Sequence, residues 1–519
     1  MTSRRQFLKT TACASAAAFL AEKTLFAKKN RPNILIFITD QVPQTSIGAY
    51  GNTYATTPNI DHLAKNGIRF SNAYTPCPLC QPARAAFWTS RYPHETNVRS
   101  NESSEHIASD MPTLGELFSA AGYECYHTGK THDAGSLRGF TVEKRGEKER
   151  PHDEWSRYYN YDTNRDEYHT PQMIDFLKQD HDKPFLAVMD LYNPHNICNY
   201  CGVNAKHTDQ KNLPDISDEQ LPPLPDNFNV DDWQTRPLPI QYLCCTHPRL
   251  WQAALWNERN YRHYIAAFHH FLSLADEKIG LCLQALKDSG EYDNTLVVYF
   301  SDHGDGTASH RMVTKFLTFY EETNRVPFIF VGPGVRLSNY LVQNALVSLL
   351  DLLPTLCDYA GIDAPTTVRG ESLLPFFTES ETHSPNRHFL VGEWHKEYNE
   401  VKRNPKYVEE RKQCVSPGRM VRSERYKYMH YLEGNGKELY DLVNDPGEKI
   451  NLAQNPDYAP ILQQHRHWLD QHCTETNDDF KTLKVDVDPG FRHSHKAGFQ
   501  HHYAPLKTGV SEDDEQGKV

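Results

Sequence analysis

Four apolar runs in this 519-residue chain each lead into a group of polar or ionisable residues. A continuous apolar run of this length is typical of a strand that is buried on both faces of a parallel sheet. In open α/β sheets, ligands bind beyond the carboxyl ends of such strands, so we expect the four polar groups to converge on one site. The runs and groups are Ile34–Ile38 with Thr39–Asp40, Gly122–His127 with Gly129–His132, Phe185–Leu191 with Asn193–His195, and Leu296–Phe300 with Ser301–His303.

The length of the chain exceeds the usual limit for a single hydrophobic core, so a large domain and a smaller one are expected. Apolar residues recur at steps of three and four from Tyr264 to Leu286, which predicts a long amphipathic helix. Short strand-like segments and a helical pattern follow residue 384. These segments are Arg419–Ser423, Tyr426–Tyr431 and Glu438–Leu442 as antiparallel strands, and Tyr458–His472 as a helix.

We therefore predict an α/β fold with a large, mostly parallel or mixed central sheet flanked by helices, and a smaller C-terminal α+β subdomain with an antiparallel sheet. The catalytic domain is expected to span residues 33–383 and the C-terminal subdomain residues 384–474. Residues 475–519 are polar and aperiodic, which predicts a loosely ordered tail or one that packs on a neighbouring subunit in an oligomer.

The N-terminus resembles an export signal, because Arg4 and Arg5 precede a short apolar stretch from Thr11 to Ala21. This pattern is typical of the twin-arginine pathway. The stretch is short for a membrane span, and cleavage is expected after Ala27. We predict residues 1–27 as a signal peptide, export by the twin-arginine machinery, and a periplasmic or secreted mature protein. A membrane anchor that is never cleaved is the alternative.

Charge and cysteine content restrict the partners and the bonds of this chain. A net charge of -12 argues against nucleic acid or an anionic membrane as a partner, so an anionic substrate would need a local basic pocket. Among the twelve cysteines, Cys198 and Cys201 are separated by two residues, with His195 and His207 nearby. They could form a zinc site or a redox pair. No second C-x-x-C follows, so a disulfide is the simpler interpretation.

Cys80 stands two residues before Pro82 and four before Arg84. The segment that follows favours a helix as far as Thr89, and a proline is tolerated in the first helical turn. Cys80 would then lie beside unpaired backbone N–H groups and the positive end of the helix dipole, which together suit an anion such as sulfate or phosphate. The alternative for a single cysteine is a small buried apolar residue.

With the segments Thr57–Asp61, Phe70–Tyr74 and Phe87–His94 around it, this motif resembles that of the type I sulfatases, which belong to the alkaline phosphatase superfamily. In that family the cysteine of C-x-P-x-R is oxidised to formylglycine by a formylglycine-generating enzyme. Most members have serine where this chain has Ala83, but the spacing of cysteine, proline and arginine is intact. The resemblance runs from residue 33 to about 452 and implies the alkaline phosphatase-like sulfatase fold.

The resemblance also implies a divalent cation held by the strand ends and by the modified cysteine. Many sulfatases have aspartate and asparagine where this chain has Gln41 and His303, and the Gln/His variant resembles choline sulfatases and phosphonate monoester hydrolases. Calcium is expected because the site is rich in oxygen ligands, and manganese is the alternative because imidazole suits it better. The implied metal ligands are Asp40, Gln41, the modified Cys80, Asp302 and His303.

In the implied mechanism, the hydrated aldehyde at position 80 attacks the sulfur of a sulfate ester, and Arg84 holds this nucleophile. His195 protonates the departing oxygen, and His132 takes the proton that allows the aldehyde to reform. The implied catalytic residues are Cys80, Arg84, Lys130, His132, His195 and Lys315, and the implied substrate-binding residues are Lys130, His195, His310 and Lys315.

The expected function is that of an exported sulfatase that removes sulfate from a carbohydrate, such as the algal polysaccharide ulvan or a glycosaminoglycan oligosaccharide. A choline or aryl sulfatase, or a phosphonate monoester or phosphodiester hydrolase of the same superfamily, is the alternative within enzymes. A third possibility is a sulfated-glycan binding protein in which Cys80 stays unmodified. The presence of both a candidate acid and a candidate base argues against mere binding.

Overall fold

The structure is a computed structural model of the chain. It describes residues 31–101, 104–143, 165–204, 216–230, 256–315, 318–378, 387–395, 417–432 and 436–483, and the single positions 236, 237, 240, 249 and 253. The predicted signal peptide, 1–27, lies outside these residues. Within them, no helix combines the length and the apolar character that crossing a membrane requires.

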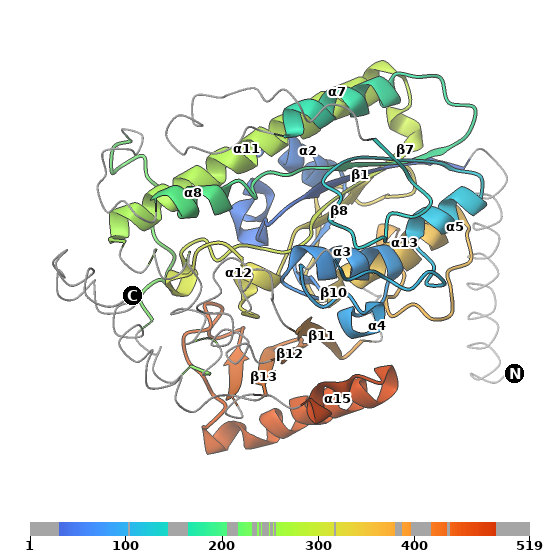
Figure 1. The fold of residues 1–519 in the computed structure, drawn as a ribbon. Coiled ribbons are helices and arrows are strands. Elements are labelled where there is room, and N and C mark those ends of the chain that lie inside the picture. The colour runs from blue at the N-terminus through green and yellow to red at the C-terminus, as the bar shows by residue number, and fades with distance from the viewer. Residues whose placement is uncertain are drawn as a thin grey trace, which may run out of the picture.

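An eight-stranded mixed sheet forms the centre of the fold (Figure 1). Its strands lie in the order β5 (Thr141–Val142), β4 (Glu124–Gly129), β6 (Phe185–Asp190), β1 (Asn33–Thr39), β7 (Thr295–Ser301), β8 (Phe328–Val331), β2 (Ile68–Phe70) and β9 (Tyr340–Val342). The four predicted strands, β4, β6, β1 and β7, are adjacent and parallel, whereas β8 runs antiparallel to β7. The carboxyl ends of these four strands therefore meet at one edge, as the sequence predicted.

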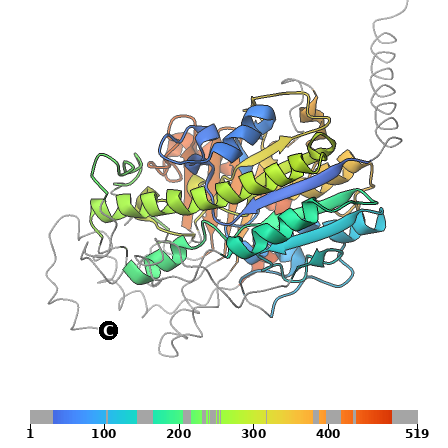
Figure 2. The ribbon, with the colours of Figure 1, turned by 90° about the horizontal axis from the view of Figure 1, so that it is seen from above.

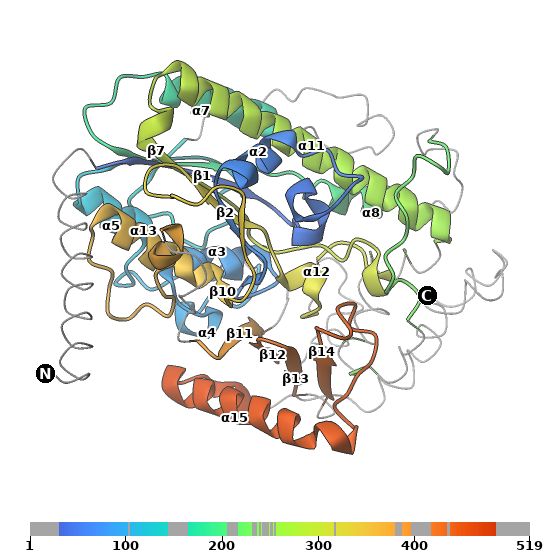
Figure 3. The same ribbon diagram turned by 180° about the vertical axis from the view of Figure 1, so that it is seen from behind.

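Helices cover both faces of this sheet. The residues of β1 alternate between two apolar clusters, with Leu35 and Phe37 in one and Ile34, Ile36 and Ile38 in the other. This alternation is the period of two that a strand imposes on its side chains. One face packs against α2 (Pro58–Asn66), α7 (Asp166–Leu177) and α11 (Glu258–Asp288), and the other against α3 (Cys80–Thr89), α5 (Leu114–Ala120) and α13 (Leu352–Ala360) (Figures 1 and 3).

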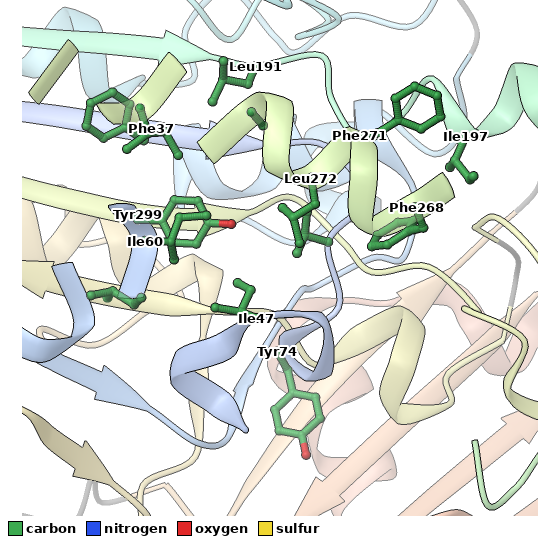
Figure 4. Packing of buried hydrophobic residues seen from close by; sticks show 14 of the residues in the cluster. Phe37, Ile47, Ile60, Tyr74, Leu191, Ile197, Phe268, Phe271, Leu272 and Tyr299 are labelled. Carbon is green, nitrogen blue, oxygen red and sulfur yellow. The ribbon is translucent and has the colours of Figure 1, made fainter. Parts of the chain in front are cut away.

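The long helix predicted around Tyr264–Leu286 is confirmed as α11. It begins after Asn257, whose side chain accepts the backbone N–H of Asn260 and so caps the first turn. Its apolar stripe packs with β1 and β7 in one cluster, and Figure 4 shows Phe268 and Leu272 of the helix with Tyr299 of β7. Seen from above, α11 lies along the sheet with α7 and α8 (Ile197–Asn204) beside it (Figure 2).

A separate four-stranded antiparallel sheet forms the C-terminal unit, in the order β11 (Phe389–Trp394), β12 (Gly418–Ser423), β13 (Tyr426–Tyr431) and β14 (Gly436–Asp441). Helix α15 (Ala459–Thr476) packs on it (Figure 1). The expected fold class is thus confirmed, although β11 was not among the predicted strands. Shorter elements are β3 (Ala73–Tyr74), β10 (Val347–Ser348), α4 (Pro93–Thr96) and α12 (Glu321–Asn324).

The first residues of the predicted tail, 475–483, pack against the C-terminal unit. Helix α15 continues to Thr476, and Phe480 is fully buried in the cluster between α15 and the antiparallel sheet. Asp478 forms a buried ion pair with Arg419 of β12, at 2.7 Å from Asp478 Oδ2 to Arg419 Nε. The chain up to residue 483 therefore packs as part of the C-terminal unit. The prediction of a tail that mediates an oligomer falls on residues 484–519, outside the described part of the chain.

His94 of α4 joins the large domain to the C-terminal unit. Its Nδ1 lies 2.6 Å from Oε1 of Glu393 in β11, and its Nε2 lies 3.1 Å from the carbonyl oxygen of Thr476. Both partners only accept hydrogen bonds, so both ring nitrogens must carry protons and His94 is an imidazolium. Burial opposes this charge, but the nearby Glu393 carboxylate outweighs it and raises the pKa of His94 above 6.5.

We expect this junction to make stability depend on pH. A histidine with a raised folded-state pKa stabilises the fold fully below its unfolded pKa of 6.5, and the contribution is lost as pH rises through the folded value. The His94→Gln variant should be less stable than the parent by about 2 kcal/mol near pH 6, since it loses a charge-assisted hydrogen bond. Thermal unfolding should show this gap narrowing as pH rises above 6.5 through the folded-state pKa of His94. A gap that stays constant over this range would contradict a charged His94.

Candidate active site

Four buried side chains from different parts of the chain converge beyond the carboxyl ends of the strands. Asp40 follows β1, Asp302 and His303 follow β7, and Cys80 is the first residue of α3. One ligand atom from each of these four residues lies within 4.8 Å of the others. All four side chains are buried. The sequence placed these residues at strand ends and at a helix start, and the parallel arrangement of β1 and β7 brings them together.

The thiol of Cys80 lies at the centre of this group. Its Sγ is 2.7 Å from Lys315 Nζ, 3.1 Å from His303 Nε2 and 3.8 Å from Asp40 Oδ1. Burial raises the pKa of the Cys80 thiol to about 11, although Lys315 partly offsets this rise. Because the thiolate is the reactive form of cysteine, the unmodified side chain is a weak nucleophile at neutral pH. Nucleophilic chemistry at this position therefore calls for conversion of the cysteine.

The positive charge of Arg84 offsets the negative charges of three carboxylates at the site. Arg84 is fully buried one turn after Cys80 on α3, and its guanidinium contacts three carboxylates. The distances are 2.5 Å from Nη1 to Asp190 Oδ2, 3.0 Å from Nε to Asp302 Oδ2 and 3.5 Å from Nη2 to Asp40 Oδ2. A rigid guanidinium can bond several carboxylates at fixed angles, so Arg84 sets the relative positions of these groups.

Lys130 and Lys315 add two ammonium groups to the site. Lys130 follows β4 and contacts Asp40 Oδ2, and Lys315 contacts Cys80. Burial, together with the nearby Lys315, lowers the pKa of Lys130 to about 8. Burial alone would lower the pKa of Lys315, but its interactions with Cys80, Cys198 and Asp302 outweigh burial and raise it. These two buried ammonium groups, one beside Cys80 and one beside Asp40, form the local basic pocket that the acidic chain needs for an anionic substrate.

The donor set fits a divalent cation. His303 Nδ1 lies 2.9 Å from the carbonyl oxygen of Gly304 and must donate to it, so Nε2 keeps its lone pair towards Cys80, Asp40 and Asp302. Burial lowers the pKa of His303 to about 3, which keeps the ring neutral. Burial alone would raise the pKa of Asp302, but the surrounding positive charges lower it. Two carboxylates and a neutral imidazole are suitable ligands for calcium or manganese.

Gln41 contacts the site through its backbone, while its side chain points to other residues. Its backbone N–H donates to Asp302 Oδ1 at 3.1 Å. The side-chain Nε2 donates to Asp305 Oδ2 at 2.6 Å, and Oε1 accepts from Cys198 Sγ at 3.4 Å. Both ends of the amide are therefore occupied by protein groups. The role of Gln41 as a metal ligand stays a prediction.

His132 and His195 are close enough to the site for its lysines to affect their titration. Burial, then Lys130, lowers the pKa of His132 to about 2. Burial, then Lys315 and Lys130, holds the pKa of His195 well below 6.5. His310 is also buried, with its ring stacked on Tyr320 at a centroid distance of 4.2 Å. Its contact with substrate stays a prediction.

Three residues at the site were missed in the sequence. Asp190, at the end of β6, binds Arg84, and Asp305 binds Gln41. Both lie at or just after strand ends, the same signal that identified Asp40. Cys198 was interpreted as part of a disulfide, a zinc site or a redox pair. Cys198 and Cys201 are free buried thiols, so the disulfide prediction is wrong, and no disulfide joins any of the cysteines in the described segments.

Comparison with known proteins identifies the family. The sulfatase family model matches residues 32–362, and the model for the C-terminal part of N-sulphoglucosamine sulphohydrolase matches residues 309–475. The chain belongs to the sulfatase family. It is therefore a sulfuric ester hydrolase, and members of this family generally use a formylglycine and a divalent metal ion.

Individual relatives agree with this assignment. The sulfatase is 47% identical over 482 residues to a Delta 4,5-hexuronate-2-O-sulfatase of Bacteroides thetaiotaomicron, covering 92% of this chain and 96% of that protein. It is 25% identical over 461 residues to an ulvan-active sulfatase of Formosa agariphila, covering 87% and 83%. A solved structure of a 2-O GAG sulfatase superposes with a TM-score of 0.78 at 47% identity, covering 89% of this chain and 96% of the other. The expected alkaline phosphatase-like sulfatase fold is confirmed.

Proposed function

We propose that this sulfatase removes the 2-O-sulfate from 4,5-unsaturated hexuronate residues of glycosaminoglycan fragments. The observation that carries the chemistry is the convergence of Cys80 with two carboxylates, a neutral histidine and two lysines in one buried site. Support for the sugar comes from the relative of that specificity, which is 47% identical over almost the whole of both chains. Conservation of nearly half of the residues along that length favours a shared substrate pocket over a shared fold alone.

Two groups that the chain acquires after synthesis supply the reactivity. A formylglycine made from Cys80 by a formylglycine-generating enzyme supplies a hydrated aldehyde, and a divalent ion supplies positive charge at the oxygens. Asp40, Asp302 and His303 would hold the ion together with residue 80. Calcium is our first choice, since oxygen ligands dominate, and manganese is the alternative. Metal analysis of protein purified from its native host distinguishes the two.

The basic groups of the site are placed to bind and stabilise the sulfate. Lys315 and Lys130 lie beside Cys80 and Asp40, so their ammonium groups can contact the sulfate oxygens as these gain negative charge during transfer. Arg84, ion-paired with three carboxylates, keeps residue 80 and the acidic ligands in a fixed arrangement. Electrostatic stabilisation by positioned donors of this kind is commonly the largest contribution to catalysis.

His195 and His132 are proposed as the proton-transfer groups. Burial, together with the positive charges of Lys130 and Lys315, holds the pKa of both rings low in the free enzyme. A bound sulfate offsets those charges, which raises the pKa of His195 and allows it to protonate the departing sugar oxygen. His132 stays neutral and can accept the proton that is released when the aldehyde reforms.

The proposal predicts a clear order of substrates. The two test substrates are an unsaturated disaccharide with a 2-O-sulfated uronate and the same disaccharide sulfated only at the 6-position of the hexosamine. We expect kcat/KM for the first to be higher by at least about 10³-fold. In the second substrate the sulfur atom is held away from the nucleophile, so attack on it is slow. Release of inorganic sulfate from matched disaccharides measures this. Choline sulfate, aryl sulfates and phosphonate monoesters belong in the same panel. Faster turnover of any of these three would make the corresponding enzyme class the better assignment.

We also propose that the protein is exported as a folded chain and acts in the periplasm or outside the cell. The twin-arginine pattern and the apolar stretch before Ala27 support this. Export after folding suits an enzyme whose cysteine must be modified in the cytoplasm. N-terminal sequencing of protein from the periplasmic fraction tests the cleavage site, and recovery of the uncleaved chain in the membrane fraction would reject it.

A further inference from the structure

Asp305 is a fully buried carboxylate that lies outside the group of four candidate metal ligands. It accepts hydrogen bonds from three donors. Tyr264 Oη lies 2.7 and 2.9 Å from its two oxygens, the backbone N–H of Thr307 lies 2.8 Å from Oδ1, and Gln41 Nε2 lies 2.6 Å from Oδ2. A buried charge is costly unless it is satisfied in this way. Two of these donors, Gln41 and Tyr264, also bond to groups of the active site.

The first connection runs through Gln41, which lies next to Asp40. Gln41 has a φ of 78°, in the left-handed region that is unfavourable for a residue with a side chain. This conformation directs its backbone N–H to Asp302 Oδ1. The side-chain amide is held at one end by Asp305 and at the other by the Cys198 thiol. Asp305 therefore helps to hold the strained backbone between the two carboxylates that would bind the ion.

The second connection runs through Tyr264 of α11. The Tyr264 oxygen accepts the backbone N–H of Thr314 at 2.7 Å, so its own proton is free to go to Asp305. Thr314 immediately precedes Lys315, whose Nζ lies 2.7 Å from Cys80 Sγ. The Asp305–Tyr264 pair thus fixes the backbone that carries Lys315. A substitution of Asp305 can therefore alter the position of Lys315, although Asp305 itself does not contact substrate.

We propose that Asp305 is a positioning residue for sulfate ester cleavage, which ties the acidic ligands to Lys315 through Gln41 on one side and Tyr264 on the other. The inference rests on the proposed roles of Asp40, Asp302 and Lys315. Residues in the layer around metal ligands commonly change metal affinity or activity by 10- to 100-fold when they are altered, about the effect expected here.

Two substitutions test the connections through Gln41 and through Tyr264 separately. Asp305→Asn keeps the size of the side chain but replaces one acceptor by an NH₂ donor, which opposes the donor of Gln41. Tyr264→Phe removes the hydroxyl and leaves the Thr314 N–H without its acceptor. Matched controls are Asp276→Asn, a buried carboxylate on α11 that accepts the N–H groups of Asn59 and Ile60, and Tyr123→Phe, whose hydroxyl donates to the carbonyl of Pro32.

The experiment compares the four variants with the parent enzyme in kcat, in KM, and in the calcium and inorganic sulfate concentrations that half-saturate the rise in Tm. We expect Asp305→Asn to lower kcat by about 10- to 100-fold and to weaken the calcium response by a similar factor. Tyr264→Phe should weaken the sulfate response by about fivefold or more, because Lys315 loses its fixed position. Both control variants should lower Tm. Their kcat and their half-saturating calcium and sulfate concentrations should stay within about twofold of the parent values.

The proposal is wrong if Asp305→Asn and Tyr264→Phe lower Tm while both half-saturation concentrations and kcat stay like those of the controls. Failure of the proposed substrate would look different. In that case the parent enzyme would not release sulfate from the uronate disaccharide, but the calcium and sulfate responses of Tm, which need no turnover, would still distinguish the variants from their controls.

Discussion

We expect the Cys80→Ala enzyme to fold and to bind sulfate but to lose at least about 10⁴-fold in kcat, since removal of a nucleophile is among the most damaging changes in an active site. The side chain is small and buried, so its truncation leaves the fold intact at a modest cost in stability. Cys80→Ser should be equally inactive in steady state. A serine could form a sulfated ester but has no second hydroxyl from which to expel the sulfate.

The measurement is sulfate release from the 2-O-sulfated uronate disaccharide, with Tm recorded to verify folding. The Cys125→Ala variant is the matched control, because Cys125 is also a buried cysteine and lies at the opposite end of β4 from Lys130. It should keep the parent kcat. If Cys80→Ala retained more than about one hundredth of the parent rate, the nucleophile would have to be another group.

The Arg84→Met substitution should cause the largest loss of stability. Arg84 and its partners Asp40, Asp190 and Asp302 are all fully buried, with side-chain exposures of 0%. Removing one partner of a buried ionic group leaves uncompensated charge, which typically costs about 3–5 kcal/mol. Activity should vanish with it, because the acidic ligands would repel one another and lose their relative positions.

Chemical denaturation measures this effect, and Arg425→Met provides a matched control. Arg425 binds Asp441 with two hydrogen bonds, but its side chain is 48% exposed, so water and salt screen the pair. The Arg425→Met protein should unfold close to the parent midpoint. Equal shifts for both arginine variants would show that Arg84 is not the central counter-charge of the site.

Much of the fold could be predicted because each local pattern agrees with its tertiary environment. The run Ile34–Ile38 reads as a strand buried on both faces, and β1 is one. The stripe from Tyr264 to Leu286 reads as an amphipathic helix, and α11 covers the sheet with it. Polar residues at the ends of adjacent parallel strands must meet at one edge, so the position of the site also followed from the sequence.

The connections around the site could not be predicted, since they depend on contacts between residues that are far apart in the chain. Tyr264 was assigned to the core from its place in the apolar stripe, and only the structure shows its hydroxyl between Asp305 and Thr314. Cys198 suggested a disulfide, whereas its buried thiol donates to Gln41. The direction of the Tyr264 and Cys198 side chains decides these contacts, and the spacing of residues along the sequence does not determine that direction.

The most direct test of the account is peptide mass spectrometry of residue 80 in protein made together with a formylglycine-generating enzyme, combined with sulfate release by the same sample. We predict that the fraction of formylglycine at position 80 equals the fraction of active enzyme. A preparation that releases sulfate at full rate while residue 80 is entirely unmodified cysteine would contradict the proposed nucleophile.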